Sequence, residues 1–138
     1  MKKVLLIITS LFGLALTINA SKFVNLTPMP KHITVAEGAY KLHESYSINA
    51  KHLPDSICVE AEKFVQTILK TTGCKARITS KKKADIEMSL DTNLPNEGYK
   101  LSVKKKKIQI SASTTSGFFY AFQTIKKIMP AHVMAGLN

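Results

Sequence analysis

The sequence contains no tryptophan, only one arginine among its 20 basic residues, and two cysteines in 138 residues. Its length excludes a complete (β/α)8 enzyme, because that barrel alone needs roughly 200 to 250 residues. With 45% apolar and 21% charged residues, the composition is that of an ordinary globular protein, which excludes disordered, collagenous and polytopic membrane chains. We therefore expect one compact domain. The formal net charge of +11 is its unusual property.

The first 20 residues are typical of a secretory signal peptide. Two lysines precede an apolar run from Val4 to Leu16, and Ala20 is a small residue at a plausible cleavage point. The run is shorter than the ~20 residues that cross a bilayer comfortably, so we expect cleavage after Ala20 and no stable membrane insertion. The sequence thus predicts a signal peptide at 1–20, a domain at 21–138 with its core at about 23–130, and a secreted or periplasmic mature chain.

An exported chain often carries disulfides, and Cys58 and Cys74 are the only candidates. The segment between them has a helical pattern, and at ~1.5 Å rise per residue its ends lie roughly 24 Å apart. A disulfide needs Cα atoms within about 7 Å. We predict that both thiols are unpaired, and the same distance argues against a two-cysteine metal site.

Two segments show apolar residues at helical spacing. The first runs from about Asp55 to Thr72, and Gly73 fits a left-handed C-terminal cap. The second begins near Ser116 or Gly117 and stops before Pro130. We expect the second helix to be apolar on more than one face.

Between these helices the apolar period changes to two, which predicts four strands. Their apolar positions are Ala76 and Ile78; Ile86, Met88 and Leu90; Tyr99, Leu101 and Val103; and Ile108, Ile110 and Ala112. The link Lys104 to Lys107 is too short for a parallel crossover, so the last two strands should form a hairpin. Weaker strand candidates lie at His32 to Val35, Tyr40 to Leu42 and Tyr46 to Ile48. The predicted fold class is α+β: an antiparallel or mixed β-sheet of about four or more strands, with two helices packed on one face.

Lysine runs at 81–83 and 104–107 are a possible patch for phosphate or anionic lipid. The single arginine, the lack of interleaved aromatic residues and the absence of a basic recognition helix argue against nucleic acid. Both runs fall in predicted turns, so we interpret them as solvated surface.

Candidate catalytic and metal-binding residues are few. The four histidines show no metal-ligand spacing: His32, His43, His52 and His132. The nearest acid clusters are Glu60 with Glu62, which do not share a helix face, and Asp85 with Glu87, whose strand pattern points them to solvent. We interpret both pairs as surface charges without the burial that keeps a catalytic acid protonated. No catalytic, cofactor-binding or metal residue is assigned, and no cofactor is predicted.

Four stretches, in this order, carry a family resemblance. Asn25 to Pro30 reads N-L-T-P-M-P, 37–42 reads E-G-A-Y-K-L, 97–103 reads E-G-Y-K-L-S-V, and 117–130 opens with G-F-F-Y-A-F-Q-T-I and ends in M-P. Together they resemble the N-terminal, non-catalytic domain of glycoside hydrolase family 20 β-N-acetylhexosaminidases over nearly the whole mature chain. The usual glycine after the Phe-Tyr pair is Ala121 here.

In the family that the chain resembles, catalysis belongs to a following (β/α)8 barrel, in which an adjacent Asp-Glu pair works with the substrate's acetamido group and tryptophans line the sugar pocket. This sequence has no Asp-Glu dipeptide and no tryptophan. The resemblance therefore implies the accessory domain of a secreted enzyme that removes terminal N-acetylhexosamine from glycans, truncated before its barrel and inactive alone. The chain itself is then not catalytic, although its parent family is a glycoside hydrolase.

The partner that the resemblance implies is the barrel. The second helix offers more apolar surface than one sheet face requires, so we expect barrel contact at Phe118, Phe119, Phe122, Ile125 and Met129. Two alternatives stay open. Similar modules precede the barrels of secreted O-GlcNAc hydrolases and α-glucuronidases, and the lysine turns would also serve a standalone secreted domain that binds anionic polysaccharide.

Overall fold

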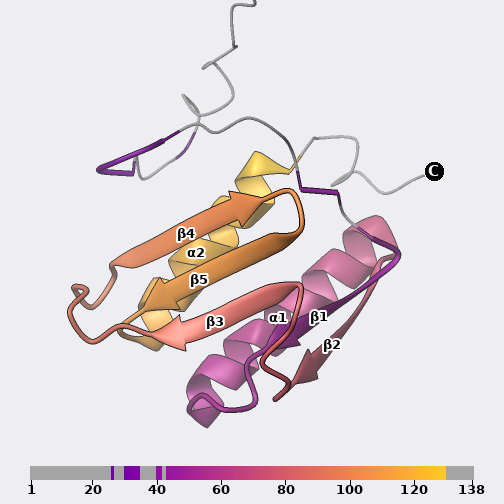
Figure 1. Ribbon diagram of the computed structural model, residues 1–138, viewed down its shortest axis with the longest axis horizontal. Helices are drawn as coiled ribbons and strands as arrows, with labels where there is room; N and C mark the ends of the chain where they lie inside the picture. Colours follow the sequence, from indigo (N-terminus) through magenta and orange to yellow (C-terminus); the bar gives the residue numbers. More distant parts are fainter. Residues whose placement is uncertain (1–25, 27–29, 35–39, 42, 130–138) are drawn as a thin grey trace, which may run out of the picture.

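The computed structural model describes residues 26, 30–34, 40–41 and 43–129. They form two layers, a five-stranded sheet and a pair of helices behind it (Figure 1). The elements in chain order are β1 (Ser45–Asn49), α1 (Asp55–Thr72), β2 (Lys75–Thr79), β3 (Ile86–Leu90), β4 (Tyr99–Lys104), β5 (Lys107–Ala112) and α2 (Thr115–Ile128). The predicted α+β class is confirmed. The predicted signal peptide lies outside the described residues.

Helix α1 has the predicted bounds because its sequence carries one apolar stripe and a strong stop signal. The buried side chains of the stripe are Ile57, Ala61, Phe64, Val65 and Ile68. Gly73 adopts the left-handed conformation at φ 71°, and its N–H donates to the Leu69 carbonyl at 2.9 Å. A residue without a Cβ takes up this conformation at little cost, so the helix ends there.

Helix α2 begins at Thr115, slightly earlier than predicted, because Thr114 serves as its N-cap. The Thr114 hydroxyl accepts a hydrogen bond from the Gly117 N–H at 3.3 Å. The two helices pack against each other as well as against the sheet, and the rings of Phe64 and Phe122 stack with centroids 4.5 Å apart.

The sheet order is β2-β1-β3-β5-β4. The β4–β5 hairpin is antiparallel, as predicted, whereas β1 runs parallel to both β2 and β3, and β3 runs parallel to β5. The candidate strand at Tyr46 to Ile48 is confirmed as part of β1. Residues 32–34 and 40–41 are not strands, and the remaining candidate positions, Val35 and Leu42, lie outside the described residues.

The link between β2 and β3 is short for a parallel connection, which usually takes a dozen or more residues. The short link is possible because β3 is staggered along the sheet. Ile48 of β1 pairs with Ile78 near the end of β2 and with Ile86 at the start of β3, so the chain only has to pass β1 before β3 begins. Beside this short overlap, the Asp85 carboxylate accepts hydrogen bonds from the Ser47 N–H at 2.8 Å and from the Ser47 hydroxyl at 2.9 Å. Asp85 is half-buried on the polar side of the sheet, and its carboxylate has a structural role beyond that of a surface charge, because it joins β1 to the start of β3.

The core lies between the sheet and the helices and takes up most of the apolar surface of α2. Phe118, Phe122 and Ile125 are 0%, 3% and 2% exposed, so the prediction that they contact another domain is wrong. They are buried because α1 and α2 share one core, which gives α2 two apolar neighbours at once. Phe119 remains 41% exposed, and Met129 packs partly against the core.

Both thiols are unpaired, as predicted. The Cys58 Sγ donates to the Ala50 carbonyl oxygen at 3.1 Å, and burial raises the pKa of this thiol. Among the described residues, neither helix combines the length and the apolar character of a membrane span.

Candidate functional site

The face of the sheet opposite the helices is polar, and no described helix or strand covers it (Figure 1). It is called the open face below. The strands alternate, so each sends its apolar side chains to the core and its polar ones to this face. Register aligns the polar positions into cross-strand rows, one of which runs from Asn49 through Glu87 and Gln109 to Ser102. A second row joins Ser89, Ser111 and Lys100.

A shallow hollow of about 320 Å³ lies on the open face over β3, β5 and β4. Its shape follows from side-chain size, because serines are short and their neighbours are long. Ser89, Ser102 and Ser111 leave the depression, and the longer side chains of Glu87, Gln109 and Lys100 stand around them. The hydroxyls of Ser89 and Ser111 are 2.8 Å apart and form a hydrogen bond.

Ion pairs organise the charged groups near the hollow. Lys107 Nζ is 2.6 Å from Glu87 Oε1, and Lys100 Nζ is 2.9 Å from Asp91 Oδ2. The hydrogen bond from Lys100 holds the pKa of Asp91 below its usual value, with a further contribution from the Asn93 N–H. The ionised form of Asp91 is therefore stabilised, and this carboxylate is not poised to donate a proton near neutral pH.

The residues considered in the sequence are scattered rather than brought together. Glu60 lies on α1, where it pairs with Lys63 at 2.7 Å, whereas Glu87 lies on β3. Glu62 is exposed on α1. His52 Nδ1 lies 2.9 Å from Asn49 Oδ1; His32 and His43 are exposed, and His132 lies outside the described residues. In the described part of the chain, no group of three His, Cys, Asp or Glu side chains is placed to hold a metal ion. Residues 81–83 and 104–106 are exposed, consistent with solvated turns.

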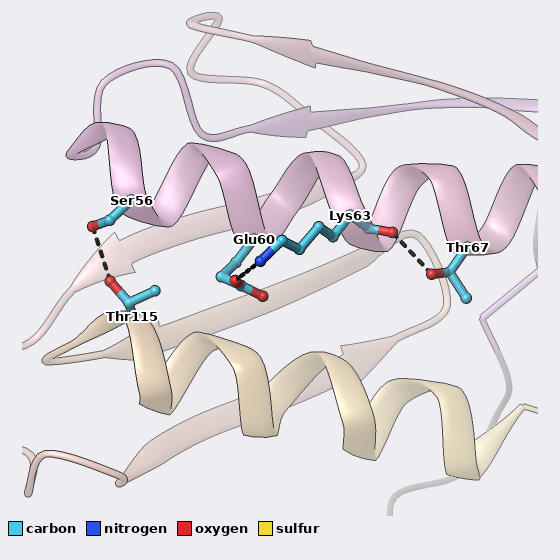
Figure 2. A network of polar contacts seen from close by, with 5 residues as sticks. All are labelled: Ser56, Glu60, Lys63, Thr67 and Thr115. Atoms are coloured by element: carbon cyan, nitrogen blue, oxygen red, sulfur yellow. Dashed lines mark hydrogen bonds and ion pairs between the residues drawn. The ribbon is translucent and has the colours of Figure 1, made fainter.

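A second, smaller depression of about 80 Å³ lies between α1 and α2 on the helix layer. Figure 2 shows polar contacts on the same layer, where Ser56 and Thr115 join the two helices through hydroxyls 2.9 Å apart. Farther along α1, Glu60 pairs with Lys63, and the Thr67 hydroxyl donates to the Lys63 carbonyl at 2.9 Å. The partly exposed Phe119 ring lines this depression and makes an edge contact with Tyr120 at 5.4 Å.

Two of the four motif stretches meet in space and have a structural role. The segment before β4 lies against the start of α2 so closely that a Cβ on Gly117 would be 2.6 Å from the Gly98 carbonyl oxygen. The hydroxyls of Tyr99 and Thr124 are 2.6 Å apart, and the Ser113 hydroxyl donates to the Pro95 carbonyl at 2.9 Å. These residues fasten β4 to α2.

Comparison with known proteins gives a consistent result. The sequence model of the family described as "Glycosyl hydrolase family 20, domain 2" matches residues 24–137. A "Beta-hexosaminidase" of Porphyromonas gingivalis is 27% identical over 125 residues, which cover 81% of this chain and 15% of that protein.

Solved structures share the fold. The Streptomyces plicatus N-acetyl-β-hexosaminidase in complex with Thio-NAglucal has a TM-score of 0.72 at 18% identity, covering 80% of this chain and 22% of that one. The β-N-acetylhexosaminidase of Bacteroides fragilis has a TM-score of 0.59 at 24% identity, covering 74% and 20%. The chain thus spans no more than 22% of the length of these three relatives.

Proposed function

Because the chain belongs to glycosyl hydrolase family 20, in which it matches domain 2, we propose that it is the accessory N-terminal domain of a secreted β-N-acetylhexosaminidase and is inactive alone. Domain 2 of this family normally sits in one chain with a catalytic barrel. Export through the predicted signal peptide at 1–20 is part of this proposal. The family match favours it over the O-GlcNAc hydrolase and α-glucuronidase alternatives.

One observation carries the proposal: the alignment takes in 81% of this chain but only 15% of the P. gingivalis enzyme. Glycoside hydrolysis needs a carboxylic acid beside the scissile bond together with a second group that stabilises the developing cation. Within the described residues, Glu60 and Glu87 are ion-paired with lysines, and Asp85 is hydrogen-bonded to Ser47. Each of the three carboxylates is engaged by a neighbour within the domain, which supports a catalytic site outside it.

We expect the purified chain to release no 4-nitrophenol from 4-nitrophenyl N-acetyl-β-D-glucosaminide above the rate of a buffer blank. The P. gingivalis β-hexosaminidase serves as the positive control under the same conditions. Sustained release in proportion to the concentration of this chain would contradict the proposal that the domain is inactive alone.

The surface that we propose for contact with the barrel is the helix layer around Phe119. This ring is 41% exposed beside a depression, and burying an exposed phenylalanine contributes about 1.5–3 kcal/mol. A chimaera tests it, with residues 24–137 replacing the matched segment of the P. gingivalis enzyme. Phe119→Ser should lower the stability of the chimaera by about that amount. In the isolated chain, the same change should cost no more than ~1 kcal/mol, measured by urea denaturation.

Leu69→Ser is the matched control, since Leu69 is 39% exposed on α1 and does not line that depression. It should affect the chimaera and the isolated chain alike. If Phe119→Ser also gives equal losses in both, Phe119 does not contact the barrel.

A further inference from the structure

The hollow on the open face is large enough to hold a small ligand. Its volume of about 320 Å³ is at the lower end of the ~300–1,000 Å³ found for such sites. Hydroxyl, amide, carboxylate and ammonium groups line it, and no aromatic side chain does. Hydrogen bonds, rather than stacking, would therefore hold an occupant.

Some of these polar groups are available for a ligand. Among the described residues, neither the Ser102 hydroxyl nor the Gln109 amide makes a side-chain hydrogen bond, and both line the hollow. Each offers a donor and an acceptor, which is the pairing that sugar hydroxyls require. The Ser89–Ser111 pair adds two more hydroxyl oxygens at the floor.

The charge of the open face favours an acidic occupant. Alternation and register place five cationic side chains on it: Lys75, Arg77, Lys100, Lys104 and Lys107. The same pattern places three carboxylates there, and each is already engaged: Glu87 with Lys107, Asp91 with Lys100, and Asp85 with Ser47. Lys75, Arg77 and Lys104 form no ion pair within the described residues. An excess of unpaired positive charge attracts anions to this face.

We propose that the open face binds an acidic oligosaccharide, with one sugar seated in the hollow and the anionic groups of the rest of the oligosaccharide drawn to the unpaired cations elsewhere on the same face. Nucleic acid fits less well, because unpaired bases bind by stacking on aromatic rings and the hollow has none. The site goes beyond the accessory role and does not depend on it, since every group belongs to this chain. In a longer enzyme it would hold acidic polymer near the catalytic domain.

Calorimetric titration of the purified chain with hexagalacturonate at low ionic strength tests the site. Maltohexaose is the neutral comparison, and inorganic polyphosphate is the anion without sugar rings. We expect binding of hexagalacturonate that weakens with salt, no binding of maltohexaose, and weaker binding of polyphosphate per charge. Lys100→Gln should weaken hexagalacturonate binding about two- to fivefold, the effect of one exposed ion pair.

Lys70→Gln is the matched control, because it removes the same charge from an exposed position on α1, away from the open face. It should leave the affinity unchanged. Ser111→Tyr fills the hollow without altering charge and should abolish binding, while thermal melting confirms that each variant is folded. The proposal would be overturned if hexagalacturonate did not bind, or if polyphosphate bound equally tightly. It would also be overturned if Lys100→Gln and Lys70→Gln had equal effects, or if folded Ser111→Tyr retained its affinity. None of these outcomes bears on hexosaminidase activity, which the arylglycoside assay tests separately.

Discussion

Phe118→Ala is expected to destabilise the domain by about 3–5 kcal/mol, the range for removing a fully buried phenylalanine. Phe118 is 0% exposed and is among the largest fully buried side chains in the described core. Alanine would leave a cavity between α2 and the sheet. The cavity would persist, because the helix and the strands around it are closely packed and cannot move far enough to fill it. Since small domains unfold with a total of about 5–15 kcal/mol, the variant should lose a large fraction of its stability. Urea denaturation followed by circular dichroism measures the loss.

The neighbouring residue provides the control for this experiment. Phe119→Ala removes the same atoms from the next position of the same helix, where the side chain is 41% exposed. It should cost less than ~1 kcal/mol in the isolated chain. Equal losses at the two positions would show that the side of α2 facing the core is assigned incorrectly.

Gly117→Ala is expected to destabilise the domain by about 1–3 kcal/mol, although alanine is the better helix former. Helix propensity alone predicts a gain of about 1 kcal/mol. The added Cβ, however, would lie 2.6 Å from the Gly98 carbonyl oxygen and 2.8 Å from the Ala112 Cβ. A backbone carbonyl cannot rotate away as a flexible side chain can, so α2 would have to move off the start of β4. Urea denaturation would show the loss.

Ser116→Ala is the control for this second substitution. Ser116 is exposed on the same turn of α2 and already has a Cβ, so its change tests propensity without adding a contact. We expect an effect within ~0.5 kcal/mol. A stabilising Gly117→Ala variant would contradict the close approach of α2 to the 94–98 segment.

Local signals in the sequence were sufficient for several elements. Helix α1 was predictable to its last residue because one apolar stripe and Gly73 act within a few turns of chain. The β4–β5 hairpin was predictable because the connection between the two strands is too short for a parallel crossover.

Features that depend on distant contacts were not predictable. The burial of Phe118, Phe122 and Ile125 results from α1 and α2 sharing one core, and no pattern within α2 shows which helix lies beside it. The parallel β2–β1–β3 arrangement depends on the stagger of β3 past the end of β1, which six linking residues do not reveal.

The hollow on the open face was also missed, for a related reason. Ser89, Ser102, Gln109 and Ser111 appear in the sequence only as the solvated half of alternating strands. Register turns these separate polar positions into adjacent rows, and the short serine side chains then leave a depression. The signal available was one serine on the polar side of each of β3, β4 and β5.

The place of β1 between β2 and β3 in the sheet has a consequence for how the chain folds. Its partners come late, since Ser45 pairs with Lys75 and Ser47 contacts Asp85, 38 residues onward. By contrast, β4, β5 and α2 are consecutive and contact one another within residues 99–128. Contacts between distant segments form slowly because the intervening chain must first be ordered. We infer that the hairpin and α2 form the early folding unit, and that β1, which leaves the ribosome before the other described strands, is among the last to be paired.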